Sequence, residues 1–251
     1  MNIIDRNDEP PAFYYMNGTR AERASAELEE NSPPGTTITF PLVLRDPDLV
    51  GGALDVLFDE PSGTFELARP PAVGEPVALR VRSNATLDRE KRDTYRGTVR
   101  VCDVAMEAAT TTTRAHCAEA ELVVLVSDVN EHAPELVHPL ENLTLLESTA
   151  LGPIASIRLD ARDPDLLVNA LVCYSFAPAS RASDDSTASA LSHFTIDPTN
   201  GVVSLVQPLD AASQRSFVLP IRLANADARP PLHRDYVLYI TGAHAFSLLH
   251  F

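Results

Sequence analysis

The feature that most constrains the fold of this chain is an internal repeat. Asp46-Pro47-Asp48 recurs as Asp163-Pro164-Asp165, and Glu30 recurs as Glu147, each at a shift of 117 residues. Three further matches, at shifts of 122 to 124, are Asp5-Asn7-Asp8 with Asp128-Asn130-Glu131, Leu87-Asp88 with Leu209-Asp210, and Asp103 with Asp227. Because order and spacing hold along the chain, the sequence predicts two copies of a unit of about 110–120 residues.

Each copy has the pattern of β-strands, in short runs of β-branched and apolar residues bounded by turn residues. The expected strands are Thr36–Leu44, Val77–Val81, Thr98–Cys102, Glu121–Val126, Leu143–Leu146, Ile154–Leu159, Ala170–Phe176, Val202–Val206, Phe217–Leu223 and Tyr236–Thr241. Asn200-Gly201 predicts a hairpin turn, and the Ala-, Ser- and Asp-rich segment Ala177–Ser192 predicts a loop insertion. So many short strands favour an all-β fold of two tandem Greek-key sandwiches.

Charge and hydropathy exclude several classes of function. Lys and Arg number 20 against 35 Asp and Glu, a net charge of −15. This balance argues against a nucleic-acid binder, whose affinity comes mainly from cations that meet phosphates, and against docking on anionic lipid. It suits a partner that is itself a cation. No stretch approaches the roughly 20 apolar residues of a membrane span, so we expect no membrane insertion by this segment.

The chain has marks of a secreted or cell-surface protein. Asn17, Asn84 and Asn142 each begin an Asn-X-Ser/Thr triplet, and we expect at least two of them to be exposed and open to glycosylation. No signal peptide follows Met1, so the chain is interpreted as a fragment of a longer protein.

Three cysteines leave one unpaired. Cys102 and Cys117 flank an expected hairpin loop, and we expect them to form a disulfide with Cα atoms about 5.5–6 Å apart. Cys173 lies in an apolar run and is expected to be a buried free thiol. The histidines, among them His138, His233 and His244, fit no metal-ligand pattern and are expected at the surface.

The repeated positions are mostly acidic, which is unusual, since repeats normally share core residues. Acidic side chains gathered in one place repel one another unless a cation lies among them. A single Asp-Pro-Asp is usually a solvated turn, but the repeated set points to a site. Oxygen ligands without histidine or cysteine favour calcium, which takes six to eight oxygens.

These motifs resemble those of the cadherin family, over nearly the whole chain to about Thr241. Asp128-Val-Asn130-Glu131-His132-Ala-Pro134 is similar to the cadherin linker Asp-X-Asn-Asp-Asn-X-Pro. The other matches are the Glu30 segment, Asp88-Arg89-Glu90, the Asp163–Asn169 loop, Ala226-Asp227 and the hairpin Phe194–Gly201. The resemblance implies seven-stranded, immunoglobulin-like β-sandwiches in two repeats, 10–130 and 131–242. Residues 1–9 would end a preceding repeat or linker, and 243–251 would be an atypical tail.

The resemblance also implies calcium ions, three in this family, between successive repeats. The implied ligands are Glu30, Asp88, Glu90, Asp128, the Val129 carbonyl, Asn130, Glu131, the His132 carbonyl, Asp163, Asp165, the Asn169 backbone and Asp227. A partial site lacking its upstream repeat would comprise Asp5, Asn7, Asp8, Asp46, Asp48 and Asp103. Arg89 is expected to face solvent.

The chain departs from the family pattern in several places. Glu131 stands for an aspartate and His132 for an asparagine, and Gly52 stands in the first repeat where the second has Asn169. Ala212 replaces the glutamate expected after Leu209-Asp210, and the linker motif does not recur after Thr241. We therefore expect only the central junction to hold a complete site.

The function implied by the resemblance is calcium-dependent cell–cell adhesion by part of a longer single-pass membrane protein, at the extracellular face of the plasma membrane. Its partners would be other cadherin ectodomains, homophilic or heterophilic, and internal protocadherin-like or Fat-like repeats fit a chain without tryptophan. A non-adhesive spacer, a heterophilic ligand-binding module and a truncated gene product are the alternatives. We expect no enzyme, because the sequence contains no catalytic fingerprint.

Overall fold

The computed structural model describes residues 9–48, 53–105, 114–178, 185–225 and 227–244. The chain divides into two compact units, Met1–Val129 (unit 1) and Asn130–Phe251 (unit 2). This boundary lies one residue before the expected one.

Unit 1 is a β-sandwich of two four-stranded sheets. Its strands are β1 (Ala12–Tyr15), β2 (Arg23–Glu29), β3 (Thr37–Arg45), β4 (Ala53–Asp59), β5 (Phe65–Leu67), β6 (Pro76–Val81), β7 (Thr94–Ala105) and β8 (Arg114–Ser127). One sheet has the order β1-β3-β6-β5 and the other β2-β8-β7-β4. β2 runs parallel to β8 and the other pairs are antiparallel. β1 and β2, the two N-terminal segments, lie in different sheets.

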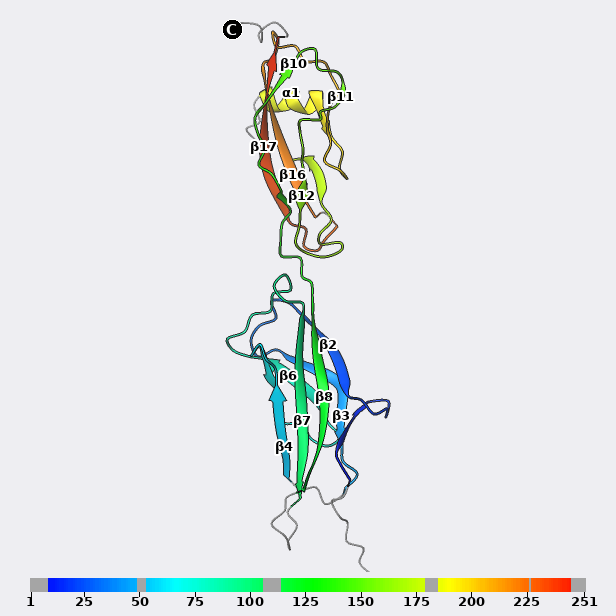
Figure 1. Ribbon diagram of the computed structural model, residues 1–251. Coiled ribbons are helices and arrows are strands. Elements are labelled where there is room, and N and C mark those ends of the chain that lie inside the picture. The colour runs from blue at the N-terminus through cyan, green and yellow to red at the C-terminus, as the bar shows by residue number, and fades with distance from the viewer. Residues whose placement is uncertain (1–8, 49–52, 106–113, 179–184, 226, 245–251) are drawn as a thin grey trace, which may run out of the picture. The chain divides into compact units, whose positions relative to one another are not determined.

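The core of unit 1 follows from strand alternation. In β7 the inward positions Tyr95, Val99 and Val101 are buried, as a two-residue period requires. Phe40 and Phe65 come from the opposite sheet and are fully buried with them. The long antiparallel pair β7 and β8 dominates this unit (Figure 1). Near its C-terminal end, β7 carries Asp103 at an inward-facing position with 0% exposure. The strand therefore places a carboxylate at the edge of the core.

Unit 2 has the same plan with a more broken second layer. Its elements are β9 (Glu135–Leu136), β10 (Leu143–Leu146), β11 (Gly152–Pro153), β12 (Ala161–Arg162), β13 (Cys173–Phe176), α1 (Asp185–His193), β14 (Phe194–Ile196), β15 (Val203–Leu205), β16 (Ser216–Ala224) and β17 (His233–Ala243). The sheets are β10-β17-β16-β13, β11-β15-β14 and β12-β9. The all-β expectation is confirmed, and β10 runs parallel to β17 as β2 does to β8.

Two predictions on unit 2 were wrong. The segment Ala177–Ser192 was expected as a loop, but it contains most of α1, because Ala190 is fully buried in the core of unit 2 and Phe194 anchors the helix end. Ile154–Leu159 was expected as a strand, but the chain turns there, with Ile157 N–H donating to Ile154 O at 3.0 Å. The turn still buries Ile154, Ile157 and Leu159, so an apolar run fills the core without a strand.

The predicted hairpin at Asn200-Gly201 joins β14 to β15 by a longer connection than a two-residue turn. Asp197 accepts hydrogen bonds from Thr199 N–H at 2.9 Å and Thr199 Oγ1–H at 2.7 Å, which shape this loop. Gly201 has a φ of 68°, and a Cβ there would lie 2.8 Å from the ring of Tyr174. Glycine is therefore required by both conformation and space.

Candidate cation site

The C-terminal end of unit 1 is organised around a buried glutamate. Glu30 follows β2 and is 2% exposed. Its carboxylate accepts hydrogen bonds from Arg89 N–H at 3.0 Å and Val129 N–H at 2.8 Å. Its own N–H donates to Ser127 O at 3.0 Å. Glu30 therefore ties the loop after β6 to the segment after β8.

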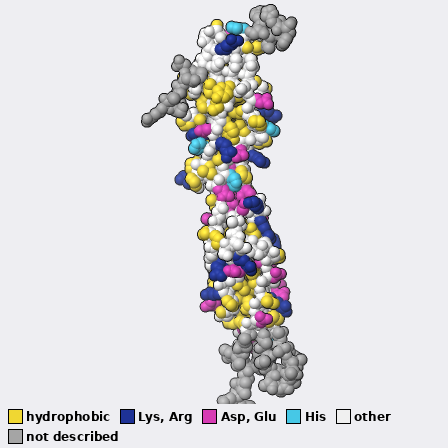
Figure 2. Space-filling view, turned by 90° about the vertical axis from the view of Figure 1, so that its left-hand side faces the viewer, with side chains coloured by type: hydrophobic (Ala, Val, Ile, Leu, Met, Phe, Trp, Pro, Cys, Tyr) yellow, Lys and Arg dark blue, Asp and Glu magenta, His cyan; other side chains and the backbone are white. Residues whose placement is uncertain are grey.

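Two more carboxylates join Glu30. One oxygen from each of Glu30, Glu90 and Asp128 lies within 4.8 Å of the others, and the side chains of Glu90 and Asp128 are only 20% and 12% exposed. Acidic side chains, magenta in Figure 2, gather at this end of unit 1. Three buried or half-buried carboxylates this close repel one another strongly unless a positive charge compensates them.

Arg89 supplies that charge in the structure, and its expected solvent-facing position was wrong. The Arg89 side chain is 9% exposed, and its guanidinium donates from Nε to Asp128 Oδ1 at 2.6 Å and pairs with Glu90. Burial lowers the pKa of Arg89, but the hydrogen bond and charge of Asp128, with Glu90 and Glu30, outweigh it and raise the pKa overall. The side chain is drawn inward because the acidic cluster attracts it.

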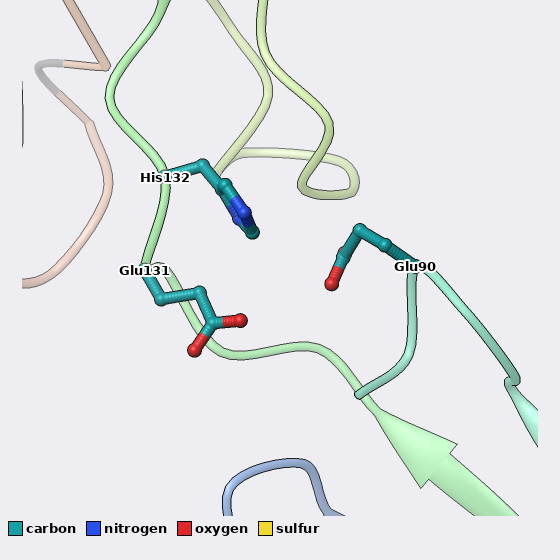
Figure 3. Close-up of side chains that lie close together, drawn as sticks. All are labelled: Glu90, Glu131 and His132. Carbon is teal, nitrogen blue, oxygen red and sulfur yellow. The ribbon is translucent and has the colours of Figure 1, made fainter. Parts of the chain in front are cut away.

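Asp88 plays a different part from the other carboxylates. Its Oδ1 accepts a hydrogen bond from Lys91 N–H at 3.0 Å, and its Oδ2 lies 2.5 Å from Lys91 Nζ. It thus shapes the turn that carries Arg89 and Glu90. Figure 3 shows Glu90 on this turn, and shows Glu131 and His132 on the segment that follows β8.

At the N-terminal end of unit 2, Asp165 holds the segment that begins the unit. It is 3% exposed, and its Oδ2 accepts from Glu131 N–H and His132 N–H, both at 3.2 Å. Its Oδ1 lies 2.8 Å from His132 Nδ1, so the ring of His132, and not only its backbone, belongs to this cluster. Asp163 is half-buried, and its Oδ1 accepts from Asp165 N–H at 3.1 Å.

Asn225 is a residue that the sequence analysis missed. It is 0% exposed, and its Nδ2 lies 2.5 Å from Asn130 Oδ1, 3.2 Å from His132 O and 3.1 Å from Asn169 O. Asp227, the residue implied by the resemblance, is exposed two positions further on.

The strand register explains this difference. The inward residues of β16 run Phe217, Leu219, Ile221, Leu223 and then Asn225, as those of β7 run from Tyr95 to Asp103. Both series are related by a shift of 122, the shift that relates Leu87 to Leu209. The position that matches Asp103 is therefore Asn225, and the alternation of β16 was the signal that could have found it.

The N-terminal end of unit 1 repeats part of this frame. Asp48 N–H donates to Asp46 Oδ1 at 3.0 Å, as Asp165 N–H does to Asp163. Asp48 Oδ2 accepts from Glu9 N–H at 3.0 Å, and Asp103 Oδ1 accepts from His116 N–H at 2.9 Å. Asp5, Asn7, Asp8 and Gly52 lie outside the described residues.

The C-terminal end of unit 2 keeps the glutamate but not its neighbours. Glu147 Oε1 accepts from Ala211 N–H at 2.6 Å, as Glu30 accepts from Arg89 N–H. Glu147 N–H donates to Ala243 O, which makes His244 the counterpart of Asp128. The ring Nδ1 of His244 lies 2.8 Å from Glu147 Oε2. Ala212 offers no ligand, so this end carries an imidazole where unit 1 carries carboxylates.

The cysteines and the glycosylation triplets lie away from the carboxylate clusters of the candidate site or on the surface. Cys102 and Cys117 form a disulfide, with Cα atoms 4.0 Å apart, closer than the expected 5.5–6 Å, because the two residues lie directly opposite in the β7–β8 pair. Cys173 is a free cysteine, half-buried rather than buried. Asn17, Asn84 and Asn142 are all exposed. The surface position expected for the histidines holds for His138, His233 and His244, but His116, His132 and His193 are half-buried.

The donor atoms of the candidate site are mostly carboxylate oxygens, which are the ligands that calcium prefers. Glu30, Glu90 and Asp128 offer carboxylate oxygens in one place, and Asp163 and Asp165 offer more at the start of unit 2. Such all-oxygen sets fit calcium better than zinc or copper. Asn225 does not fit in the same way, since it turns a nitrogen toward its oxygen neighbours. Among the described residues, no helix is long and apolar enough to cross a membrane.

Comparison with known proteins gives one family. The family model described as Cadherin domain matches residues 145–241. Human Protocadherin-16 is 31% identical over 233 residues, which cover 92% of this chain and 6% of that protein. Mouse Protocadherin Fat 2 is 35% identical over 114 residues, covering 45% of this chain and 2% of that protein. The chain thus spans only a small part of its curated relatives.

Solved structures show the same fold. The structure of Protocadherin Gamma C5 EC1-3 matches 95% of this chain and 70% of that chain, with a TM-score of 0.72 and 22% identity. That of mouse Cadherin-23 EC22-24 matches 96% of this chain and 67% of that chain, with a TM-score of 0.68 and 21% identity.

Proposed function

Because the chain belongs to the cadherin family, we propose that its two repeats bind calcium where unit 1 passes into unit 2 and serve calcium-dependent cell–cell adhesion. The chain is an adhesion-type cadherin module, and its family consists of adhesion proteins rather than enzymes. The observation that carries the calcium proposal is the grouping of Glu30, Glu90 and Asp128.

The proposed ligands come from both sides of the unit boundary. Unit 1 would contribute Glu30, Glu90 and Asp128, with Asp88 and the Val129 carbonyl. Unit 2 would contribute Glu131, Asp163 and Asp165. Asn130 and the carbonyls of His132 and Asn169 are weaker candidates, because their oxygens already face Asn225 Nδ2. Asp227 is also a weaker candidate, because it is exposed. Calcium would neutralise carboxylates that otherwise repel one another. Its role is thus to stabilise one arrangement of the two repeats over others.

Unit 1 would also supply half of a second calcium site, which a preceding repeat would complete. The residues of this half are Asp5, Asn7, Asp8, Asp46, Asp48 and Asp103. Glycans would stand on Asn17, Asn84 and Asn142, which are exposed as glycosylation requires. The parent protein would be a single-pass membrane protein with these repeats at the extracellular face. Its partners would be other cadherin ectodomains.

Calcium binding is tested by calorimetric titration of the full chain and two variants. Asp165→Ala should weaken calcium affinity at least about tenfold, because it removes one of the carboxylates that unit 2 would contribute to the site. Asp210→Ala is the matched control at the other end of unit 2, where Asp210 caps a turn through Ala212 N–H at 3.0 Å. Equal affinities of the two variants, or no binding by the wild-type chain, would contradict the proposal.

Adhesion is tested separately by equilibrium sedimentation with calcium and with EDTA. Self-association that requires calcium supports homophilic adhesion by these repeats. A monomer in both conditions would contradict it and favour the spacer or heterophilic alternative.

A further inference from the structure

The buried amide of Asn225 lies in a cage of oxygens within unit 2. Its Nδ2 faces Asn130 Oδ1 at 2.5 Å, Asn169 O at 3.1 Å and His132 O at 3.2 Å. These three oxygens come from the start of the unit and from the loop after Asp165, and Asn225 itself follows β16. One side chain therefore joins three segments that are distant in sequence.

The orientation of this amide is determined by its neighbours. Leu232 N–H donates to Asn225 Oδ1 at 2.6 Å. The opposite orientation would set the amide oxygen against three oxygens and the amide nitrogen against an N–H group, which loses every one of these hydrogen bonds. Asn130 is oriented in turn, because its own Nδ2 donates to Pro230 O. The nitrogen of Asn225 must therefore point into the oxygen cage.

The amide N–H groups of Asn225 present partial positive charge to several oxygens, and a bound cation would do the same. The equivalent inward position of unit 1, at the end of β7, is occupied by Asp103. We propose that Asn225 replaces a cation at this end of unit 2, so that the Asn130–His132–Asn169 arrangement forms without calcium. Its neutral amide also lowers the calcium affinity that an aspartate at this position would confer. This inference rests on the proposed function and deepens it, by assigning calcium dependence to the carboxylates of Glu30, Glu90, Asp128 and Asp165.

The decisive change is Asn225→Asp, which keeps the shape and reverses the chemistry. One carboxylate oxygen would still accept Leu232 N–H, but the other would face three oxygens with no proton between them. In EDTA the thermal midpoint of unit 2 should fall by several degrees, and calcium at millimolar concentration should restore it. The variant should also bind calcium at least about tenfold more tightly than wild type, because affinity rises with ligand charge.

The matched control is Asn142→Asp, the same change at an exposed asparagine of the same unit. In unglycosylated protein it should leave the midpoint in EDTA and the calcium affinity unchanged. An Asn225→Asp protein with the wild-type midpoint in EDTA, or with calcium affinity no higher than wild type, would overturn the inference.

A second readout uses the wild-type chain alone, in case Asn225→Asp does not fold. In EDTA, NMR should show the Asn225 side-chain NH₂ protons protected from solvent exchange by at least about 100-fold relative to those of Asn142. Equal exchange of the two amides would overturn the inference. Because this measurement needs no calcium, a wild-type chain that binds none would contradict the proposed function while leaving this result to stand by itself.

Discussion

Each unit holds a glutamate at its C-terminal end by equivalent hydrogen bonds. Glu30 accepts from Arg89 N–H and donates its N–H to Ser127 O, while Glu147 accepts from Ala211 N–H and donates to Ala243 O. Around this frame unit 1 gathers Glu90 and Asp128, whereas unit 2 has Ala212 and His244. The comparison teaches that the glutamate has a structural role in both ends, and that the additional carboxylates provide the capacity for a cation.

The largest expected effect separates these two roles of the glutamate. Glu30→Ala leaves two N–H groups without their acceptor in a buried place and should lower the free energy of unfolding of unit 1 by about 3 kcal/mol without calcium. Glu147→Ala, where the carboxylate is 28% exposed, should cost unit 2 about 1 kcal/mol. Differential scanning calorimetry in EDTA measures both. Equal losses at the two ends would break the comparison.

Arg89 should compete with calcium for the carboxylates of unit 1. Arg89→Gln removes the positive charge beside Asp128 and Glu90 and should destabilise unit 1 by about 2 kcal/mol in EDTA. The same variant should bind calcium several-fold more tightly, since no guanidinium has to be displaced. Arg100→Gln, on the exposed face of β7, is the control. A loss of calcium affinity in Arg89→Gln would show that Arg89 supports the site instead of opposing the cation.

The end of unit 2 can be converted toward that of unit 1. Ala212→Glu combined with His244→Asp places carboxylates at the positions that match Glu90 and Asp128. Calcium should then raise the thermal midpoint of unit 2 by a few degrees, with an affinity in the millimolar range typical of extracellular modules. The wild-type chain provides the reference. An unchanged midpoint would mean that the frame around Glu147 cannot present a cation site.

The smallest effect comes from a pair away from both ends. Arg222 and Asp235 lie opposite each other on β16 and β17, with two contacts of 2.7 Å. The hydrogen bond from Arg222 lowers the pKa of Asp235 despite some desolvation. Its contribution, about 0.5 kcal/mol for an exposed pair, is therefore present above the unfolded pKa near 3.9 and is lost as pH falls through the lower folded value.

Asp235→Asn should thus differ from wild type at pH 6 and converge with it toward pH 2, in denaturant titrations. This difference should be the same in calcium and in EDTA, because the pair has no part in the cation chemistry. A calcium-dependent difference would show that the response extends beyond the ends of the units.

Strand alternation and the repeat are local and periodic signals, and they predicted the fold class and many of the strands, but not β1, β2, β4 or β5 of unit 1. β10 was predicted to the residue, and β16 within one residue at each end. The helix α1 was missed because its burial depends on one small residue, Ala190, which composition alone reads as loop. Ile154–Leu159 was misassigned because burial in a turn leaves the same apolar composition as burial in a strand.

The sequence named the carboxylates of the candidate site but not the residues that pair with them. Glu30, Asp128 and Asp165 follow from repeated motifs, and Glu90 follows from the resemblance to the cadherin family. The inward position of Arg89 depends on the field of its neighbours, which a motif does not contain. Asn225 was passed over because the match was sought at an acidic residue, whereas the register of β16 selects the position regardless of charge.

The most direct test of the account is small-angle X-ray scattering of the full chain during a calcium titration, with calcium affinity measured on the same sample. Calcium binding should narrow the range of arrangements of the two repeats and change the radius of gyration in step with occupancy. Asp165→Ala should shift this transition to higher calcium, while Asp210→Ala should follow wild type. A radius of gyration that does not respond to millimolar calcium, or an identical response of the two variants, would contradict the account.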